Sequence, residues 1–146
     1  MSGLTLEQAN QLIQAVLKKA REMKMPPMSA AVLDTGGHLK ALQREDGQAF
    51  LRVNICQAKA WGALALGTDS RNLAERVEMG GRDEGFITAL NAMSAGRLIP
   101  LPGGLLIHDQ DGEIVGAVGV AGGDSDKDEA CAIAGIEAIG LQARLD

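Results

Sequence analysis

Aromatic residues are almost missing from this chain of 146 residues, which holds two phenylalanines, one tryptophan and no tyrosine. A pocket for a flat cofactor must therefore be lined mainly by aliphatic side chains. Cysteine is nearly as rare. The two cysteines, Cys56 and Cys131, both lie in alanine-rich helical patterns. A free cysteine in such a pattern behaves as a small hydrophobic residue, so we expect reduced thiols rather than a disulfide.

Positively charged residues are fewer than negatively charged ones. The 14 Lys and Arg residues and 19 Asp and Glu residues give a formal net charge of −5. The chain has no basic stripe, which argues against a nucleic-acid partner. No run approaches the ~20 apolar residues that span a bilayer, so we expect no membrane association. The N-terminus lacks the basic and apolar regions of a signal peptide, and we therefore predict a cytoplasmic protein.

The length fits one domain over residues 1–146. Thr5 and Gln8 form a capping-box pattern before a helix with a regular apolar stripe, and Asp111-Gly112 between two apolar runs indicates a hairpin. The expected elements are a helix ending before Pro26, strands at 28–33 and 38–43, helices at 50–66 and 71–78, a short helix within 82–97, a strand or loop at 98–101, a hairpin over 105–120, and a helix from 125 or 126 to about 144.

The second strand of the central hairpin contains two glycines. Side chains in a strand point alternately to its two faces. We therefore expect one face to carry Ile114, Gly116, Val118 and Val120, and the opposite face to carry Val115, Ala117 and Gly119. Glycines inside a strand allow another group to approach the backbone closely, and we favour a packed helix over a ligand. An opening helix followed by a hairpin is not the alternation that builds a parallel sheet.

The last predicted helix is apolar on nearly all sides, which indicates burial on more than one side. The sheet would cover one side. A partner subunit would cover the other, although the chain's own loops remain an alternative. This pattern therefore indicates a homo-oligomer.

Lys59 lies at the edge of the apolar face of the helix predicted for 50–66. An ordinary lysine there extends its ammonium group to water, and we favour that interpretation. The alternative is a partly desolvated ammonium that binds a carboxylate or a haem propionate, or acts as a base if its pKa is lowered.

The acidic segment that opens the last helix imitates two known ligand sites. A Gly-Gly pair before a helix suggests a phosphate site, but four carboxylates at Asp124, Asp126, Asp128 and Glu129 would repel a phosphate. The same acids resemble the start of a calcium loop, yet Glu129 stands where that loop needs glycine and Gly135 where it needs glutamate. We therefore interpret these acids as helix caps.

The two histidines, His38 and His108, both lie at predicted strand ends. Each is most simply a polar residue at the end of a strand, and each also offers a nitrogen that could ligate haem iron. No zinc-ligand spacing or serine-elbow motif is present.

Five stretches together resemble the GlcG/HbpS-like family of haem-binding and haem-degrading domains. They are AAVLDTGGHL (30–39), QAKAWGALALG (57–67), IPLPGGLLI (99–107), DGEIVGAVGV (111–120) and SDKDEACAIAGI (125–136). The resemblance implies an α+β, three-layer α-β-α sandwich, similar to profilin and PAS-like domains, with a central antiparallel sheet of about five strands. It also implies homo-oligomers, from dimers up to octamers.

The resemblance further implies haem handling, haem degradation or redox sensing. In that hypothesis His38 or His108 would bind the iron and Lys59 a propionate. A second hypothesis, suggested by the family's association with catabolic operons, is an enzyme or binding protein for a small carboxylate or carbonyl metabolite. Lys59 and the amides of Gly103 and Gly104 would then hold the anion, and Asp128 or Glu129 would act as acid or base. A third is an assembly module without chemistry.

Overall fold

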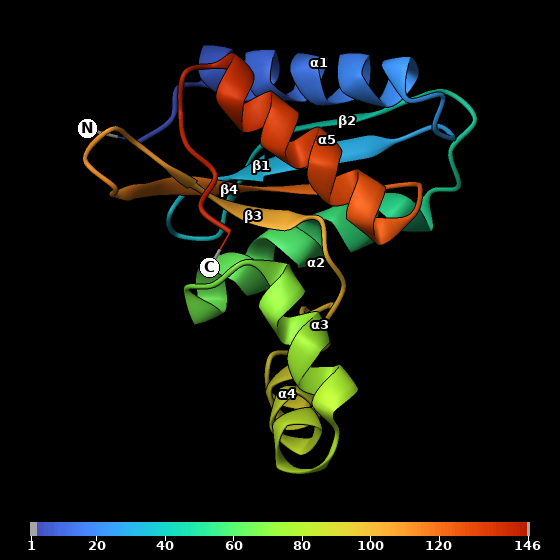
Figure 1. The fold of residues 1–146 in the computed structure, drawn as a ribbon, viewed down its shortest axis with the longest axis vertical. Helices are drawn as coiled ribbons and strands as arrows, with labels where there is room; N and C mark the ends of the chain where they lie inside the picture. The colour runs from blue at the N-terminus through green and yellow to red at the C-terminus, as the bar shows by residue number, and fades with distance from the viewer. Residues whose placement is uncertain (1–2, 146) are drawn as a thin grey trace.

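The computed structural model describes residues 3–145 and has a central antiparallel sheet between two layers of helices (Figure 1). The sheet order is β2-β1-β4-β3. Helices α1 and α5 cover one face and α2 covers the other. The elements are α1 (Leu6–Glu22), β1 (Ser29–Leu33), β2 (Leu39–Arg44), α2 (Leu51–Leu66), α3 (Ser70–Met79), α4 (Gly81–Met93), β3 (Gly104–His108), β4 (Ile114–Ala121) and α5 (Ser125–Ala138).

The three-layer α+β fold is confirmed, but the described residues form a sheet of four strands instead of about five. The segment at 98–101 is a loop, because Pro100 and Pro102 offer no backbone donors to a ladder. Beyond α5, Gln142 makes a single isolated bridge with His108. No helix within residues 3–145 combines the length and the apolar character that a membrane span requires.

Local signals explain most of the element boundaries. The capping box at Thr5 forms as predicted, with Gln8 N donating to the Thr5 hydroxyl at 3.1 Å and Thr5 N donating to the Gln8 side chain at 3.0 Å. Gly67 ends α2 in the left-handed conformation. Helix α5 stops at Ala138 rather than near residue 144. Gly140 lies two residues beyond that end with φ at +77°, a conformation that cannot continue a helix.

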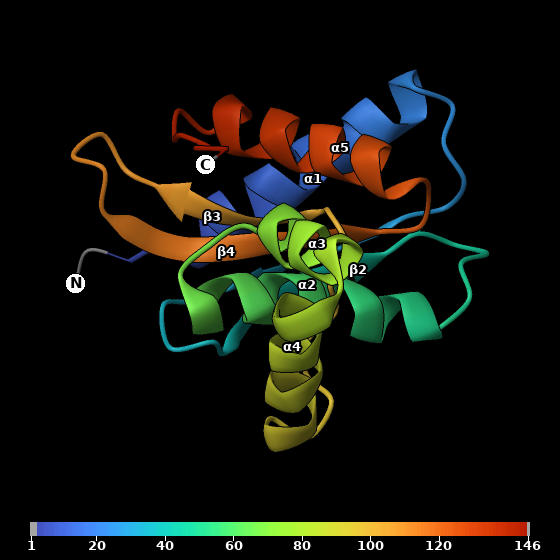
Figure 2. The ribbon, with the colours of Figure 1, turned by 60° about the horizontal axis from the view of Figure 1, so that its bottom comes forward.

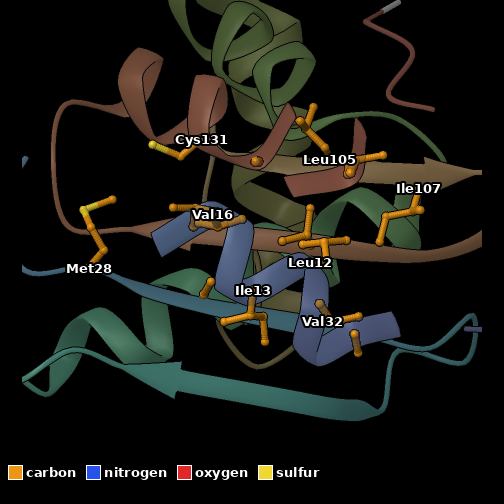
Figure 3. Close-up of a cluster of buried hydrophobic side chains, with 14 of the residues drawn as sticks. Leu12, Ile13, Val16, Met28, Val32, Leu105, Ile107 and Cys131 are labelled. Carbon is orange, nitrogen blue, oxygen red and sulfur yellow. The ribbon is translucent and has the colours of Figure 1, made fainter. Parts of the chain in front are cut away.

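The larger core lies between the sheet and the layer formed by α1 and α5 (Figure 3). Leu12, Ile13 and Val16 of α1 meet Val32 of β1 there. A β-bulge opposite the end of β3 shifts the register of β4. As a result Val115 joins this core with Val118 and Val120, so the predicted strict alternation is wrong at this position. Helix α1 also packs along α5, so part of the apolar surface of α5 is covered by the chain itself.

Helix α2 rests directly on the backbone of the sheet, which confirms the prediction of a packed helix at Gly119 of β4. At Gly116 the prediction is wrong, because the group that approaches there is the Leu33 carbonyl of β1. A Cβ atom at Gly119 would lie 1.8 Å from the carbonyl oxygen of Cys56, and one at Gly104 would lie 2.1 Å from the carbonyl oxygen of Lys59. Ala60 and Ala63 of α2 pack with Leu33, Leu106 and Ala117 of the sheet in this second core. Figure 2 shows α3 beside α2 and α4 extending away from the sheet.

The replacement Gly119→Ala is predicted to destabilise the fold by about 3 kcal/mol or more, because the added methyl group must push the α2 backbone off the sheet. A matched control is Gly85→Ala in α4, where nothing lies within 4 Å of the added Cβ. This control should stabilise the protein by roughly 0.5–1 kcal/mol through helix propensity. Urea unfolding of the three proteins measures both effects. Equal stabilities for Gly119→Ala and the parent would contradict the close contact.

Candidate functional site

Lys59 is fully buried, with 2% of its surface exposed, so the interpretation as a lysine extending to water is wrong. The contact of α2 with Gly104 carries its side chain beneath the loop before β3. There its Nζ donates to the Val120 carbonyl at 2.9 Å and to Asp128 Oδ2 at 3.2 Å. The ammonium group therefore binds a carboxylate of the chain itself and joins α2, β4 and α5.

Asp128 lies in the first turn of α5 with 1% of its surface exposed. Its second carboxylate oxygen accepts a hydrogen bond from Gly123 N at 3.0 Å. Burial raises the pKa of the Asp128 carboxyl and lowers the pKa of the Lys59 ammonium, while the attraction between the two opposite charges opposes both changes. The buried Lys59–Asp128 pair therefore fixes α2, β4 and α5 relative to one another.

Glu129, the next residue, belongs to a different cluster. Arg71 of α3 donates to both oxygens of its carboxylate, at 3.0 and 3.1 Å from Nε and 2.9 Å from Nη2, and also pairs with Asp126. This bidentate ion pair fixes α3 against the start of α5. Asp124 caps α5 by accepting a hydrogen bond from the amide of Asp126 at 3.0 Å, so the interpretation as a helix cap is confirmed for Asp124. The other three acids make ion pairs instead: Asp126 and Glu129 with Arg71, and Asp128 with Lys59.

The glycine loop before β3 lies against Lys59. A Cβ on Gly103 would be 2.9 Å from the Lys59 Nζ, so this position excludes larger residues. The amide of Gly104 already donates to the Ser70 hydroxyl at 2.8 Å, and the amide of Leu106 donates to Asp69 at 2.9 Å. The two residues at the start of α3 therefore bind the backbone of β3 instead of capping their own helix.

The two histidines lie in unlike environments. His108 is buried, with 8% exposed; its Nδ1 is 3.2 Å from the Gly112 carbonyl and its backbone exchanges two hydrogen bonds of 2.9 Å with Gln142. The His38 side chain is 82% exposed in the turn between β1 and β2. Asp34 lies 3.4 Å from its Nδ1, which leaves Nε2 for a ligand.

A cavity of about 370 Å³ opens beside the His38 turn. Trp61 of α2 forms one wall, and the guanidinium of Arg97 stacks 4.1 Å from the centre of its ring. Gly37 and Leu39, on either side of His38, both line the cavity. The remaining lining residues are Leu33, Asn54, Gln57, Ala58, Ala95 and Gly96.

Sequence reasoning did not place Trp61 and Arg97 in a site. The signal available was the tryptophan itself, the single one in the chain, in a half-buried position of α2. The structure brings Lys59, Asp128, Gly103 and Gly104 together, and it holds His38, His108 and Glu129 in separate places. Among the described residues, no group of three or more His, Cys, Asp or Glu side chains could hold a metal ion.

Comparisons with known proteins agree on one family. The family described as haem degrading protein HbpS-like matches residues 4–137. Protein GlcG of Escherichia coli K12 is 37% identical over 118 residues, covering 81% of each chain. The structure of a PduOC:haem complex superposes with a TM-score of 0.85 at 23% identity, covering 97% of this chain and 99% of that one. The structure of a double mutant of HbpS from Streptomyces reticuli superposes with a TM-score of 0.79 at 27% identity. The superposition covers 96% of this chain and 89% of that one.

A double-mutant cycle tests the buried pair. Lys59→Met and Asp128→Asn should each destabilise the protein by about 3–5 kcal/mol, because each leaves an unpaired buried charge. The double variant should cost less than the sum of the two, with a coupling of about 2 kcal/mol or more. Arg71→Met, which breaks a pair whose arginine is 37% exposed, should cost much less than either. Additive losses in urea unfolding would contradict a direct Lys59–Asp128 interaction.

Proposed function

Because the chain belongs to the haem degrading protein HbpS-like family, we propose that it binds haem, with His38 as the axial ligand of the iron. The observation that carries this proposal is the exposed imidazole of His38 between two residues that line the cavity beside Trp61. The structure of a PduOC:haem complex indicates that this fold accommodates a porphyrin. Haem would supply redox chemistry at iron, and the chain would supply the ligand and the pocket.

The residues around the cavity fit the chemistry of haem. A cavity of about 370 Å³ can receive one part of a porphyrin, with the remainder at the surface beside the exposed His38. Trp61, Leu33 and Leu39 offer an apolar wall for the porphyrin face, and the Arg97 guanidinium offers a bidentate partner for a propionate. Asp34, 3.4 Å from His38 Nδ1, would hold the proton on that nitrogen and direct Nε2 to the iron.

His108 and Lys59 fit these roles less well than His38 and Arg97. The backbone N–H and C=O of His108 are both hydrogen-bonded to Gln142, and the residue is buried. Lys59 is buried and already paired with Asp128, so we assign the propionate contact to Arg97. The same pairing disfavours the small-carboxylate hypothesis, since that hypothesis needs an open cation. Homo-oligomerisation, from a dimer to an octamer, and a cytoplasmic location stay predictions.

Titration of the protein with haemin should give a saturable shift of the Soret band with one haem per chain. His38→Ala should abolish the shift, because the iron loses its axial nitrogen. His108→Ala should leave the shift unchanged. Arg97→Met should weaken haem binding roughly tenfold or more, because the propionate loses its charge-assisted hydrogen bonds. A full shift in His38→Ala, or its loss in His108→Ala, would assign the ligand elsewhere.

Blocking the cavity without touching His38 tests the pocket separately. Ala58→Phe places a ring in the cavity and should weaken haem binding roughly tenfold or more, equal to about 1.4 kcal/mol of lost contact. Ala74→Phe is the matched control, since Ala74 is a half-buried residue of α3 that lines a different cavity. The control should bind haem as the parent does. Equal affinities in the absorbance titration for both variants would place the porphyrin outside this cavity.

A further inference from the structure

Three sulfur atoms meet at the edge of the larger core. The Cys131 Sγ of α5 lies 3.5 Å from the Met25 Sδ and 4.0 Å from the Met23 Sδ. Figure 3 shows Cys131 on the same side of the core cluster as Met28. The residues come from segments 106 and 108 positions apart in the sequence, so tertiary packing assembles the cluster.

The turn that ends α1 presents two of these sulfurs to the third. Lys24 N donates to the Arg21 carbonyl at 3.1 Å and Met25 N donates to the Ala20 carbonyl at 3.0 Å, the pair of bonds of a Schellman motif. Lys24 takes the left-handed conformation, with φ at +56°, where glycine is usual. The reversal turns Met25 into the core, 5% exposed, and leaves Met23 half-buried.

The sulfur spacing matches a metal geometry. Two metal–sulfur bonds of about 2.3 Å that meet at an angle of about 120° place their sulfurs about 4.0 Å apart. The distances from the Cys131 Sγ to the two methionine sulfurs, 3.5 and 4.0 Å, lie close to this spacing. One thiolate with two thioethers is a soft ligand set, which selects Cu(I) over hard divalent ions. Methionine side chains adjust readily to such a change.

Burial restricts the charge that this site accepts. Cys131 is fully buried and Met25 is 5% exposed, and both belong to the apolar core cluster. A monovalent ion that replaces the thiol proton leaves the cluster neutral, whereas a divalent ion leaves a net positive charge in an apolar region. The half-buried Met23 offers a route from solvent to the buried Cys131 and Met25.

We propose that Met23, Met25 and Cys131 form a binding site for a soft monovalent metal ion, Cu(I). Binding exchanges the thiol proton for the ion: the S–H bond breaks, one proton is released to solvent, and a sulfur–copper bond forms without a change in oxidation state. The site lies on the α1/α5 side of the sheet, whereas the cavity beside His38 is lined by α2, the β1–β2 turn and the loop after α4. It is therefore independent of haem binding.

Anaerobic titration of the reduced protein with Cu(I), in competition with the chromophoric chelator bicinchoninate, tests the site. The parent should retain one Cu(I) per chain. Cys131→Ser and Met25→Leu should each weaken Cu(I) retention by more than about tenfold. Replacing a residue that only hydrogen-bonds to a metal ligand already costs about that much, and these variants remove a ligand itself. Met25→Leu nearly conserves volume, so it keeps the fold intact if Cys131→Ser does not fold.

Matched controls are Cys56→Ser, Met28→Leu and His38→Ala. Cys56 donates its thiol to the Val53 carbonyl, and the Met28 sulfur lies at the Gly122 turn. All three controls should retain Cu(I) as the parent does. X-ray absorption at the copper edge should show sulfur neighbours alone, at about 2.3 Å. Failure of the parent to hold Cu(I) against the chelator, equal retention in Met25→Leu, or nitrogen neighbours at copper would overturn the proposal.

Discussion

The rest of the structure depends on one contact, the direct packing of α2 against the backbone of the sheet. Gly104 and Gly119 have no side chains, and the α2 backbone occupies the space that Cβ atoms would fill. This close approach sets the depth and rotation of α2. One face of the helix then carries Lys59 beneath the glycine loop, and another face presents Trp61 to the cavity beside the β1–β2 turn. Both the buried ion pair and the candidate haem site follow from this one contact.

The Lys59 ammonium shows how burial changes the meaning of a candidate catalytic residue. In the sequence it resembles an open cation, but in the structure it donates to Val120 and Asp128 and connects both helical layers across the end of the sheet. Such a pair contributes little net stability compared with an apolar replacement, yet losing one partner is costly. We therefore interpret Lys59 and Asp128 as a structural pair that specifies the position of α5, and we place ligand chemistry at His38.

Much of the fold could be predicted because its signals are local. The capping box at Thr5, the left-handed Gly67 and the turn glycines each act within a few residues, so the sequence pattern alone identifies them. The burial of Lys59 could not be predicted, because its partner Asp128 lies 69 residues away and only the packed structure brings them together. The cavity depends on three separate segments for the same reason. The burial of Val115 could not be predicted from strand alternation, because it results from a β-bulge that depends on the pairing of β4 with β3.

An experimental structure of the haem complex would show the iron ligand directly. We predict a bond from the iron to the Nε2 of His38, with the porphyrin against Trp61 and a propionate at the Arg97 guanidinium. The α2 helix should keep its contact with Gly104 and Gly119, because the cavity lies on the opposite side of that helix from Lys59. An iron bound to His108, or a porphyrin that does not touch Trp61, would contradict the proposed haem site.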